Sequence, residues 1–391
     1  MADDIGYEVA RLKDKLIELR RDFHRHPELS FQEHRTADIA ANYLEDVGWE
    51  VTRGVADTGV VGLLKGASPG PTVLLRVDID ALPIQEPRDR DYTSQVDGVM
   101  HACGHDGHTA VGMVVAELLS SRQESIKGNV KLVFQPAEEI MSGALPMIEA
   151  GVMKDPPVDN VLSFHLWSGL PVGKVTSQAG PIFSSADEIK ISVEGKGGHG
   201  GMPHLAVDPI LISCHVVTAL QSVLSREVQP SQAAVLGFGT IHGGTAFNVV
   251  SDEVQLTGTV RTLDDSVRAH ILKRAEEISV NVARGLRGEA RFEHVQGAPA
   301  VINDPRVARL VADVAAPIVG EENVVTISPP QVGDDATYFL REAPGCYFLV
   351  GCGNEARGIT ASHHSQHFDI DEDSLPIAAQ VLTESALRYV T

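Results

Sequence analysis

Residues 69–80 read PGPTVLLRVDID, and this stretch decides the fold class. A turn rich in proline and glycine comes first, a run of β-favouring apolar residues follows, and two aspartates close it. The run at 130–134 has the same build and ends in the polar segment Gln135–Glu139, and the run at 161–164 ends in His165. Because helical patterns separate such strands, the sequence predicts an α/β sheet with a ligand site at the carboxyl ends of its strands.

Between Phe183 and Gly297 the pattern changes. Short β-type runs and two helical patterns follow one another in the order β-α-β-β-α-β, which is typical of a ferredoxin-like unit. The α/β pattern then returns and continues to the last residues. We therefore expect an α/β domain formed by residues 1–182 and 297–391. A ferredoxin-like domain formed by residues 183–296 is expected to be inserted into it.

The composition is that of an acidic globular protein. Of 391 residues, 43% are hydrophobic and 22% are charged, and the net charge is −21. Such a charge disfavours nucleic acids and anionic membranes, because both are bound through basic side chains. No apolar run reaches the ~18 residues of a membrane span, and the acidic first residues lack the apolar core of a signal peptide. The four cysteines are too few for a disulfide framework, so we expect a cytoplasmic protein.

The segment His101–His108, HACGHDGH, is the densest cluster of potential metal ligands. A thiol at Cys103 and an imidazole at His105, flanked by glycines, suit a borderline metal such as zinc. A helical pattern follows directly, so both side chains are expected near a helix N-terminus, where a thiol becomes more acidic. A solvated polar loop before a helix is the alternative interpretation.

Three further places offer donors to such a cluster. Glu138 and Glu139 follow a strand and point to different sides, so one could bind a metal while the other acts as a base. His165 is expected to end another strand. Near the C-terminus, His363 and His364 belong to a second histidine-rich stretch, HHSQH. Taken singly, these residues also fit an acidic turn, a core histidine and a polar loop.

The glycine-rich segment Gly195–Gly201, GKGGHGG, surrounds His199. No Lys-Ser or Lys-Thr follows it, so the segment is unlike a phosphate-binding loop. Its glycines permit unusual backbone angles and the close approach of another group, with a flexible hairpin tip as the alternative. Cys214, Cys346 and Cys352 have no metal-type spacing and are expected to be buried small residues.

With these motifs the chain resembles metallopeptidase family twenty, in the amidohydrolase branch that holds aminoacylase-like enzymes, hippurate hydrolase and hydrolases of auxin–amino acid conjugates. The similarity extends over nearly the whole chain. The segments that carry it are Leu19–His24 with Pro27 and Glu28, Asp78–Ile84, His101–His108, Gln135–Glu139, Gly195–His204 with Asp208 and Pro209, and Asn248–Arg261.

The resemblance implies a di-metal, aminopeptidase-like catalytic domain whose inserted ferredoxin-like domain acts as a lid and usually forms a dimer interface. It implies that Cys103 bridges two divalent metal ions, with zinc or manganese favoured and cobalt or nickel also compatible. The remaining ligands would be His105 and His165 on one ion, and Glu139 and His364 on the other.

The resemblance also implies roles for the other site residues. Glu138 would be the general base, and Asp80 would orient a ligand. His199 would stabilise the oxyanion, in relatives often that of the other subunit. Asn248 and Arg261 would hold the carboxylate of the substrate.

Two positions depart from the family pattern. Gln366 stands where proline usually follows His-Ser, and three histidines crowd there, so His363 is an alternative last ligand. The segment Gly333–Ala336, GDDA, stands where relatives often have Glu-Asp-Phe. Both departures bear on the fit of the substrate more than on the reaction.

The implied reaction is the metal-dependent hydrolysis of an N-acyl amino acid to a carboxylate and a free amino acid, in a homodimer. Dipeptides, aminobenzoyl-glutamate and N-acetyl-diaminopimelate are alternative substrates on the same scaffold. A hydrolase with Cys103 as nucleophile is an alternative of a different class. A non-catalytic metal-binding scaffold is disfavoured, because a mere metal store needs no base such as Glu138.

Overall fold

The computed structural model describes residues 5–391 and shows a mixed α/β chain that divides into two units. Unit 1 comprises residues 5–182, 302–328 and 335–391, and unit 2 comprises residues 183–301 and 329–334. The chain returns to unit 1 at residue 302, since strand β13 (Glu289–Ala298) still belongs to unit 2. The first four residues, with which the expected catalytic domain and the acidic N-terminus begin, lie outside the described residues.

A seven-stranded sheet forms the centre of unit 1, in the order β1-β2-β4-β3-β5-β15-β6. Strands β4, β3, β5 and β15 run parallel to one another, and β1, β2 and β6 run antiparallel to their neighbours. The strand predicted around 72–77 lies within β3. The strands are β1 (Glu50–Val55), β2 (Gly59–Lys65), β3 (Ser68–Asp78), β4 (Lys127–Gln135), β5 (Asn160–Pro171), β6 (Val175–Thr176) and β15 (Gly345–Gly353).

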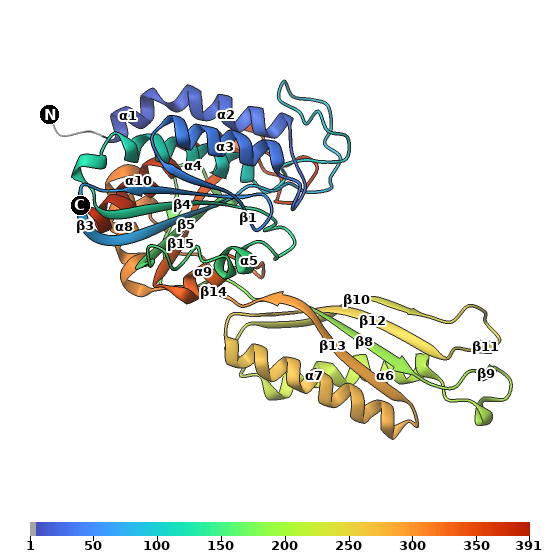
Figure 1. Cartoon of the computed structure of the whole chain (residues 1–391). Helices are drawn as coiled ribbons and strands as arrows, with labels where there is room; N and C mark the ends of the chain where they lie inside the picture. Colours follow the sequence, from blue (N-terminus) through green and yellow to red (C-terminus); the bar gives the residue numbers. More distant parts are fainter. Residues whose placement is uncertain (1–4) are drawn as a thin grey trace. The chain divides into compact units, whose positions relative to one another are not determined.

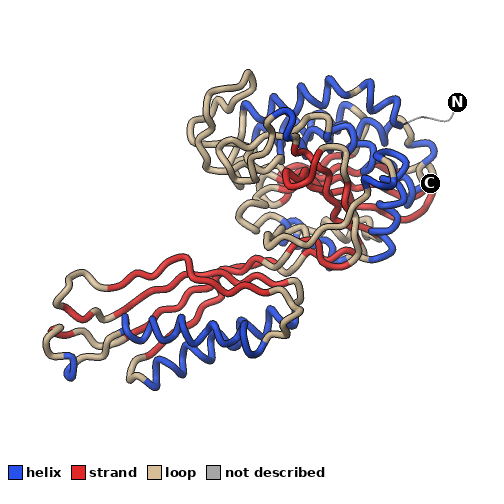
Figure 2. Tube along the Cα trace, turned by 180° about the vertical axis from the view of Figure 1, so that it is seen from behind, coloured by secondary structure: helices blue, strands red, loops and turns tan. Residues whose placement is uncertain are grey.

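Helices cover both faces of this sheet (Figure 1, Figure 2). Side chains of β3 alternate between the faces: Leu75 and Val77 join the large core with α2, α4 and α10, and Leu74 joins a smaller core with α5 and α9. None of the described helices has the length and apolar composition that a membrane-spanning segment needs. The helices are α1 (Ile5–Arg11), α2 (Lys13–Arg25), α3 (His34–Asp46), α4 (His105–Ser120), η1 (Gln123–Ser125), α5 (Ala144–Glu149), α8 (Pro305–Val319), η4 (Glu321–Asn323), α9 (Thr337–Glu342), η5 (Glu355–Arg357) and α10 (Ser374–Val390).

Unit 2 has its own four-stranded antiparallel sheet, in the order β10-β12-β8-β13. Helices α6 and α7 lie on one face of it (Figure 1, Figure 2), and their apolar side chains form a separate core with Ile189 and Ile191 of β8. Cys214 of α6 is exposed, contrary to the prediction, because it lies on the side of the helix turned away from this core, whereas Cys346 and Cys352 are buried. The further elements are β7 (Gly180–Phe183), β8 (Ala186–Glu194), β9 (Gly198–His199), η2 (Pro203–Leu205), α6 (Pro209–Ser222), η3 (Val223–Glu227), β10 (Ala234–Gly243), β11 (Val249–Val250), β12 (Glu253–Thr262), α7 (Asp265–Gly285) and β14 (Val301–Asn303).

Candidate metal centre

Polar residues gather at the carboxyl ends of the parallel strands of unit 1. Asp80 follows β3, and Glu138 and Glu139 follow β4. His165 does not end its strand as predicted: it lies within β5, which continues to Pro171 because β15 still pairs with it beyond His165. The sheet therefore brings side chains from three strands to one edge.

A tight turn before α4 places Cys103 and His105. Gly104 lies between them with a φ of 96°, in the left-handed region that favours glycine. α4 begins at His105, and both side chains are buried. The thiol and the imidazole thus lie at a helix N-terminus, as the sequence predicted.

Donor atoms of the predicted metal ligands lie close together around Cys103. Its sulfur lies 3.5 Å from Nε2 of His165, and Nε2 of His364 lies 3.2 Å from Oε2 of Glu139. One ligand atom each of Cys103, Glu139 and His364 lie within 4.8 Å of one another. Nε2 of His105 lies 3.9 Å from Oε1 of Glu139. We call these five residues the metal-centre cluster.

Two donor atoms of the metal-centre cluster have no hydrogen-bond partner in the described part of the chain. They are Nε2 of His105 and Oε1 of Glu139, and both are buried. A buried polar atom without a partner costs about 1–3 kcal/mol, so such atoms indicate a missing ligand. Thiolate, imidazole and carboxylate together suit borderline divalent cations. The residues present therefore fit bound divalent metal ions.

Hydrogen bonds on the far side of the rings orient two of the histidines. Nδ1 of His105 donates to the backbone carbonyl of Asp80 at 2.9 Å, and Nδ1 of His165 donates to the carbonyl of Leu166 at 2.7 Å. Each bond directs Nε2 of the ring toward the other donors, where its lone pair would bind a metal ion. Asp80 also accepts from the backbone N–H of Glu139 at 3.0 Å, so it holds two strand ends together.

His363 and His364 differ in what their rings contact. Nε2 of His363 donates to the carbonyl of Leu166 and its Nδ1 pairs with Oγ of Ser168, both at 3.0 Å. His364 instead directs Nε2 at Glu139. Its backbone has a φ of 63°, which is strained for a residue other than glycine. Its backbone N–H donates to the carbonyl of Ala102 at 2.8 Å. These contacts favour His364 over His363 as a donor.

The electrostatics of the cluster favour a bound cation. Burial, then the carboxylates of Glu139 and Glu138, raise the pKa of the Cys103 thiol well above its usual range. Burial opposes charge on His105, but the Asp78 carboxylate and its neighbours raise the pKa of that ring to about 10. An excess of negative charge therefore surrounds these donors, and a divalent cation would neutralise it and favour the thiolate.

His108 and Asp78 support the cluster, and the sequence analysis assigned neither a role. Nδ1 of His108 donates to Asp78 at 2.5 Å, and its Nε2 accepts from the N–H of Leu166 at 2.9 Å. Both ring nitrogens are occupied, so His108 positions other residues rather than binding a metal. Its spacing of three from His105, on one helix face, is the signal that marks it.

A second buried cluster was missed altogether. Arg20 donates to Asp106 and to Asp369, at 2.8 Å each, and His24 pairs with Asp106 at 2.7 Å and with Glu86 at 3.1 Å. We call these five residues the Arg20 cluster. It joins α2 to the residue after His105 and to the segment that follows His364. Arg20 and His24 share the buried face of α2 with Leu16 and Phe23, and charged residues at such apolar spacing were the available signal.

The predicted site residues of unit 2 are more exposed than most of the metal-centre cluster. His199 and Asn248 are exposed. The loops that carry them are neighbours, because β9 pairs with β11 and the N–H of Gly200 donates to the carbonyl of Asn248 at 2.8 Å. Arg261 lies in β12, half-buried, and donates to Oγ1 of Thr259; burial lowers its pKa.

Comparison with known proteins identifies the family. Residues 74–388 match the model described as peptidase family M20/M25/M40. The chain belongs to the peptidase M20 family. Among M20 relatives, thermostable carboxypeptidase 1 of Saccharolobus solfataricus is 40% identical, over 100% of this chain and 99% of that protein.

Two further relatives act on acylated amino acids by name. N-acetyl-L-cysteine deacetylase of Bacillus subtilis is 37% identical over 98% of this chain and 90% of that protein. IAA-amino acid hydrolase ILR1-like 4 of Arabidopsis thaliana is 35% identical over 96% of this chain and 86% of that protein. The M20 chain described here is a hydrolase of amide bonds.

A solved structure bears on the metal content. The YxeP protein of Bacillus subtilis, described as a dinuclear metal-binding peptidase of the M20 family, has a TM-score of 0.84 and 33% identity. The match covers 97% of this chain and 98% of that one. Together with the donor groups around Cys103, this likeness indicates two metal ions in the M20 chain.

The departure from the family pattern at Gly333–Ala336 includes a structural residue. Asp335 is fully buried and accepts from the side chain of Gln135 at 2.6 Å. It also accepts from the backbone N–H groups of Gly143 and Ala144, at 3.0 and 2.9 Å, where α5 begins. This acid therefore fixes the segment that follows Glu139.

Proposed function

We propose that this M20 hydrolase cleaves N-acyl amino acids to a carboxylate and a free amino acid, using water with Glu138 as the general base. The proposal rests on two buried atoms near Glu138 that have no hydrogen-bond partner, Nε2 of His105 and Oε1 of Glu139. Oε2 of Glu138 lies 3.9 Å from that nitrogen of His105. The relatives named for N-acetylcysteine and for IAA-amino acid substrates support the substrate class.

The proposed metal ligands are those of the metal-centre cluster. Cys103 would contribute its sulfur to both sites, His105 and His165 would hold one ion, and Glu139 and His364 would hold the other. We propose zinc or manganese as the native metal, with cobalt and nickel as further candidates, because the donor set mixes thiolate, imidazole and carboxylate. Asp80 orients His105 through the carbonyl contact described above.

The chemistry divides between the metals and the side chains. Two divalent cations, when bound, lower the pKa of water and polarise the amide carbonyl. Glu138 takes the proton of the attacking water and delivers it to the leaving nitrogen. His199 donates to the developing oxyanion. Arg261 binds the substrate carboxylate as a fork, with Asn248 assisting.

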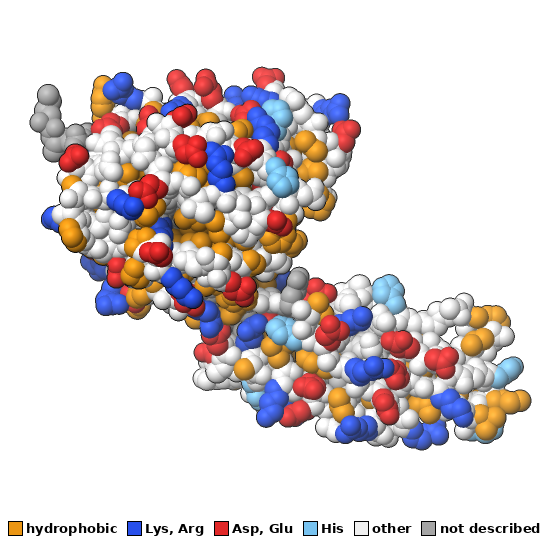
Figure 3. Space-filling model, viewed as in Figure 1, with side chains coloured by type: hydrophobic (Ala, Val, Ile, Leu, Met, Phe, Trp, Pro, Cys, Tyr) orange, Lys and Arg blue, Asp and Glu red, His pale blue; other side chains and the backbone are white. Residues whose placement is uncertain are grey.

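Unit 2 is proposed to be a ferredoxin-like lid and the surface through which two copies associate. Its strand order and its β-α-β-β-α-β element order support the fold. Hydrophobic side chains gather at the end of unit 2 that carries β9 and β11 (Figure 3), where Leu205 and Phe247 are exposed. Such patches favour association. Buried free thiols in unit 1 support a cytoplasmic location.

A carboxypeptidase is the second candidate, because the relative that is 40% identical over the full chain bears that name. N-acetyl-diaminopimelate and aminobenzoyl-glutamate are further candidate substrates. A Cys103 nucleophile is disfavoured, since burial and the nearby carboxylates raise the pKa of its thiol and an attacking sulfur must be a thiolate.

The test is the release of amino acid, detected with ninhydrin, from a panel of N-acyl amino acids and dipeptides. Chelated enzyme is assayed first, and then enzyme refilled with zinc, manganese, cobalt or nickel. Metal-dependent release from the N-acyl substrates supports the proposal and identifies the metal. Release from dipeptides alone favours the carboxypeptidase, and phenanthroline-resistant activity would point to the thiol.

A further inference from the structure

A cavity of about 440 Å³ lies beside the metal-centre cluster in unit 1. It opens at the carboxyl ends of β5 and β15, between the residues that close β5 and the short helix η5. We propose that this cavity is a substrate subsite that takes an ammonium or guanidinium group carried on an apolar stem. The inference rests on the proposed function, because it names a part of the same substrate.

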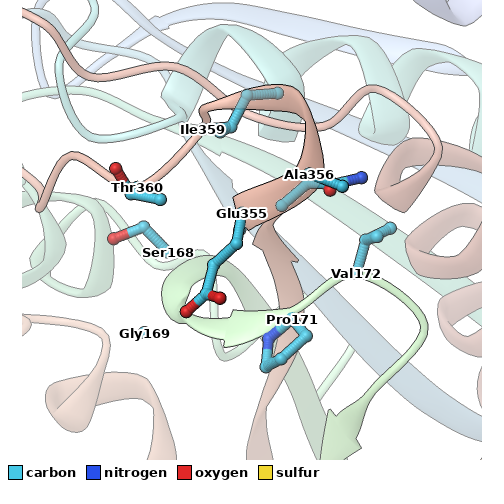
Figure 4. Close-up of a pocket in the computed structure, with 10 residues that line it drawn as sticks. Ser168, Gly169, Pro171, Val172, Glu355, Ala356, Ile359 and Thr360 are labelled. Atoms are coloured by element: carbon cyan, nitrogen blue, oxygen red, sulfur yellow. The ribbon is translucent and has the colours of Figure 1, made fainter.

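The walls of the cavity divide by chemistry (Figure 4). Pro171, Val172 and Ile359 supply apolar surface, and Ser168 and Thr360 supply hydroxyls. The Glu355 side chain extends across the cavity toward Gly169 and Pro171 in Figure 4. A volume in the ~300–1,000 Å³ range of small-molecule pockets suits one flexible side chain or acyl chain.

Glu355 is the only carboxylate among the residues that line this cavity. It is exposed, and within the described chain no Lys, Arg or His forms an ion pair with it. The nearest basic residue in the sequence, Arg357, donates instead to Asp371 at 2.8 Å and to Asp373 at 3.2 Å. An unpaired carboxylate beside hydroxyl acceptors attracts a cationic donor and repels an anion.

One side chain connects the cavity to the metal-centre cluster. Oγ of Ser168 lies 3.0 Å from Nδ1 of His363. The His363 ring stacks on Trp167 with centroids 4.5 Å apart, and its centroid lies 5.2 Å from that of His165. His363 therefore separates the cavity wall from the metal-centre cluster, and we expect one end of a substrate whose amide lies at the cluster to reach the cavity.

Two matched substrate pairs test which end that is. Nα-acetyl-lysine against Nα-acetyl-norleucine places the charge on the amino-acid side, and 6-aminohexanoyl-alanine against hexanoyl-alanine places it on the acyl side. We expect the cationic member of one pair to be favoured about five- to tenfold in kcat/KM, as for a partly exposed ion pair. The pair that shows the preference identifies the side.

Variants of Glu355 assign the preference to this carboxylate. Glu355→Gln should remove it and Glu355→Lys should reverse it, while hydrolysis of the neutral substrates and metal content stay unchanged. Glu321→Gln is the matched control, because Glu321 is likewise exposed and opens a short helix of unit 1, η4. Equal preferences in wild type and Glu355→Gln, or no preference for either cation, would overturn the proposal.

A binding measurement separates this inference from the proposed function. If metal-loaded wild type hydrolyses none of the four substrates, the proposed function fails. The cavity is then tested by calorimetric titration of the full chain with 6-aminohexanoate and with hexanoate. Tighter binding of the amine that is lost in Glu355→Gln supports the subsite, and equal binding of the two probes contradicts it.

Discussion

The metal-centre cluster and the Arg20 cluster lie next to each other in unit 1 and differ in one respect. In the Arg20 cluster every charged side chain has a partner, as in the bonds from Arg20 to Asp106 and from His24 to Glu86. In the metal-centre cluster, Nε2 of His105 and Oε1 of Glu139 are buried without a hydrogen bond, and they lie 3.9 Å from each other. Arg20, Asp106 and His105 are all fully buried, whereas His364 of the metal-centre cluster is exposed.

The difference indicates what each cluster is for. A fully satisfied buried network is complete as it folds and stiffens the elements it joins. A buried group of donors with free lone pairs is unfavourable until a cation occupies it. The Arg20 cluster includes Asp106, the residue next to His105. The hydrogen-bonded Arg20 cluster therefore holds the metal-centre cluster in place.

The largest effect is expected at Glu138, the proposed general base, whose Oε2 lies 3.9 Å from Nε2 of His105 in the metal-centre cluster. Glu138→Gln should lower kcat by about 10³-fold, because a general base contributes ~10²–10⁴, while bound metal stays at the wild-type level. Assays of amino acid release and metal analysis of the same samples measure both. Activity near that of wild type would remove Glu138 from the mechanism.

The next effect tests whether the Arg20 cluster is complete. Arg20→Ala removes the guanidinium that pairs with both Asp106 and Asp369. It should therefore lower the free energy of unfolding by about 3–5 kcal/mol. Arg53→Ala is the control, because Arg53 forms ion pairs with Asp38 and Glu45 on the surface, where such pairs contribute ~1 kcal/mol or less. Denaturant unfolding of both variants measures these free energies. Equal losses in Arg20→Ala and Arg53→Ala would contradict the claim that the Arg20 cluster stabilises the fold more than a surface ion pair.

His199 lies in neither cluster and is exposed within its own unit. If it supplies an oxyanion donor, His199→Ala should slow kcat about a hundredfold, or ~3 kcal/mol, with two metals still bound. His242→Ala, an exposed histidine of β10, should leave kcat unchanged. A loss of metal in His199→Ala would move His199 into the metal-centre cluster.

The smallest effect concerns pH and the Arg20 cluster. Burial and the Arg20 charge oppose protonation of His24, but hydrogen bonds to Asp106 and Glu86 outweigh them and raise its pKa above the usual 6.5. Protonated His24 therefore stabilises the folded chain below about pH 6.5. This stabilisation is lost as the pH rises through the pKa of His24 in the folded state.

His24→Gln should therefore destabilise the metal-free chain more at pH 6 than at pH 9, by on the order of 1 kcal/mol. Denaturant unfolding at the two pH values measures the difference. A variant that is equally destabilised at both would mean that His24 is neutral in the folded protein.

The sequence could predict those features that depend on neighbours along the chain. The apolar run of residues 72–77 predicted β3, and the helical pattern after Cys103 and His105 predicted their position near a helix N-terminus. The order of elements in unit 2 was readable in the same way. The role of each site residue stays a prediction.

Contacts between distant residues could not be predicted in this way. Arg20 meets Asp106 and Asp369 across 86 and 349 positions of sequence, and no local pattern shows that a charge on α2 is buried and paired. His363 and His364 are adjacent and alike, and contacts with distant residues, Ser168 for His363 and Glu139 for His364, distinguish them. The extent of β5 beyond His165 depended on pairing with β15.

The most direct test of the account is the number of metal ions bound per chain, measured by mass spectrometry of the metals after refilling and dialysis. We predict two ions for the wild type and fewer than one for Cys103→Ala, because that change removes the donor shared by both sites. Arg53→Ala should keep two. Two ions in Cys103→Ala, or none in the wild type, would contradict the claim that the incomplete cluster is a metal centre.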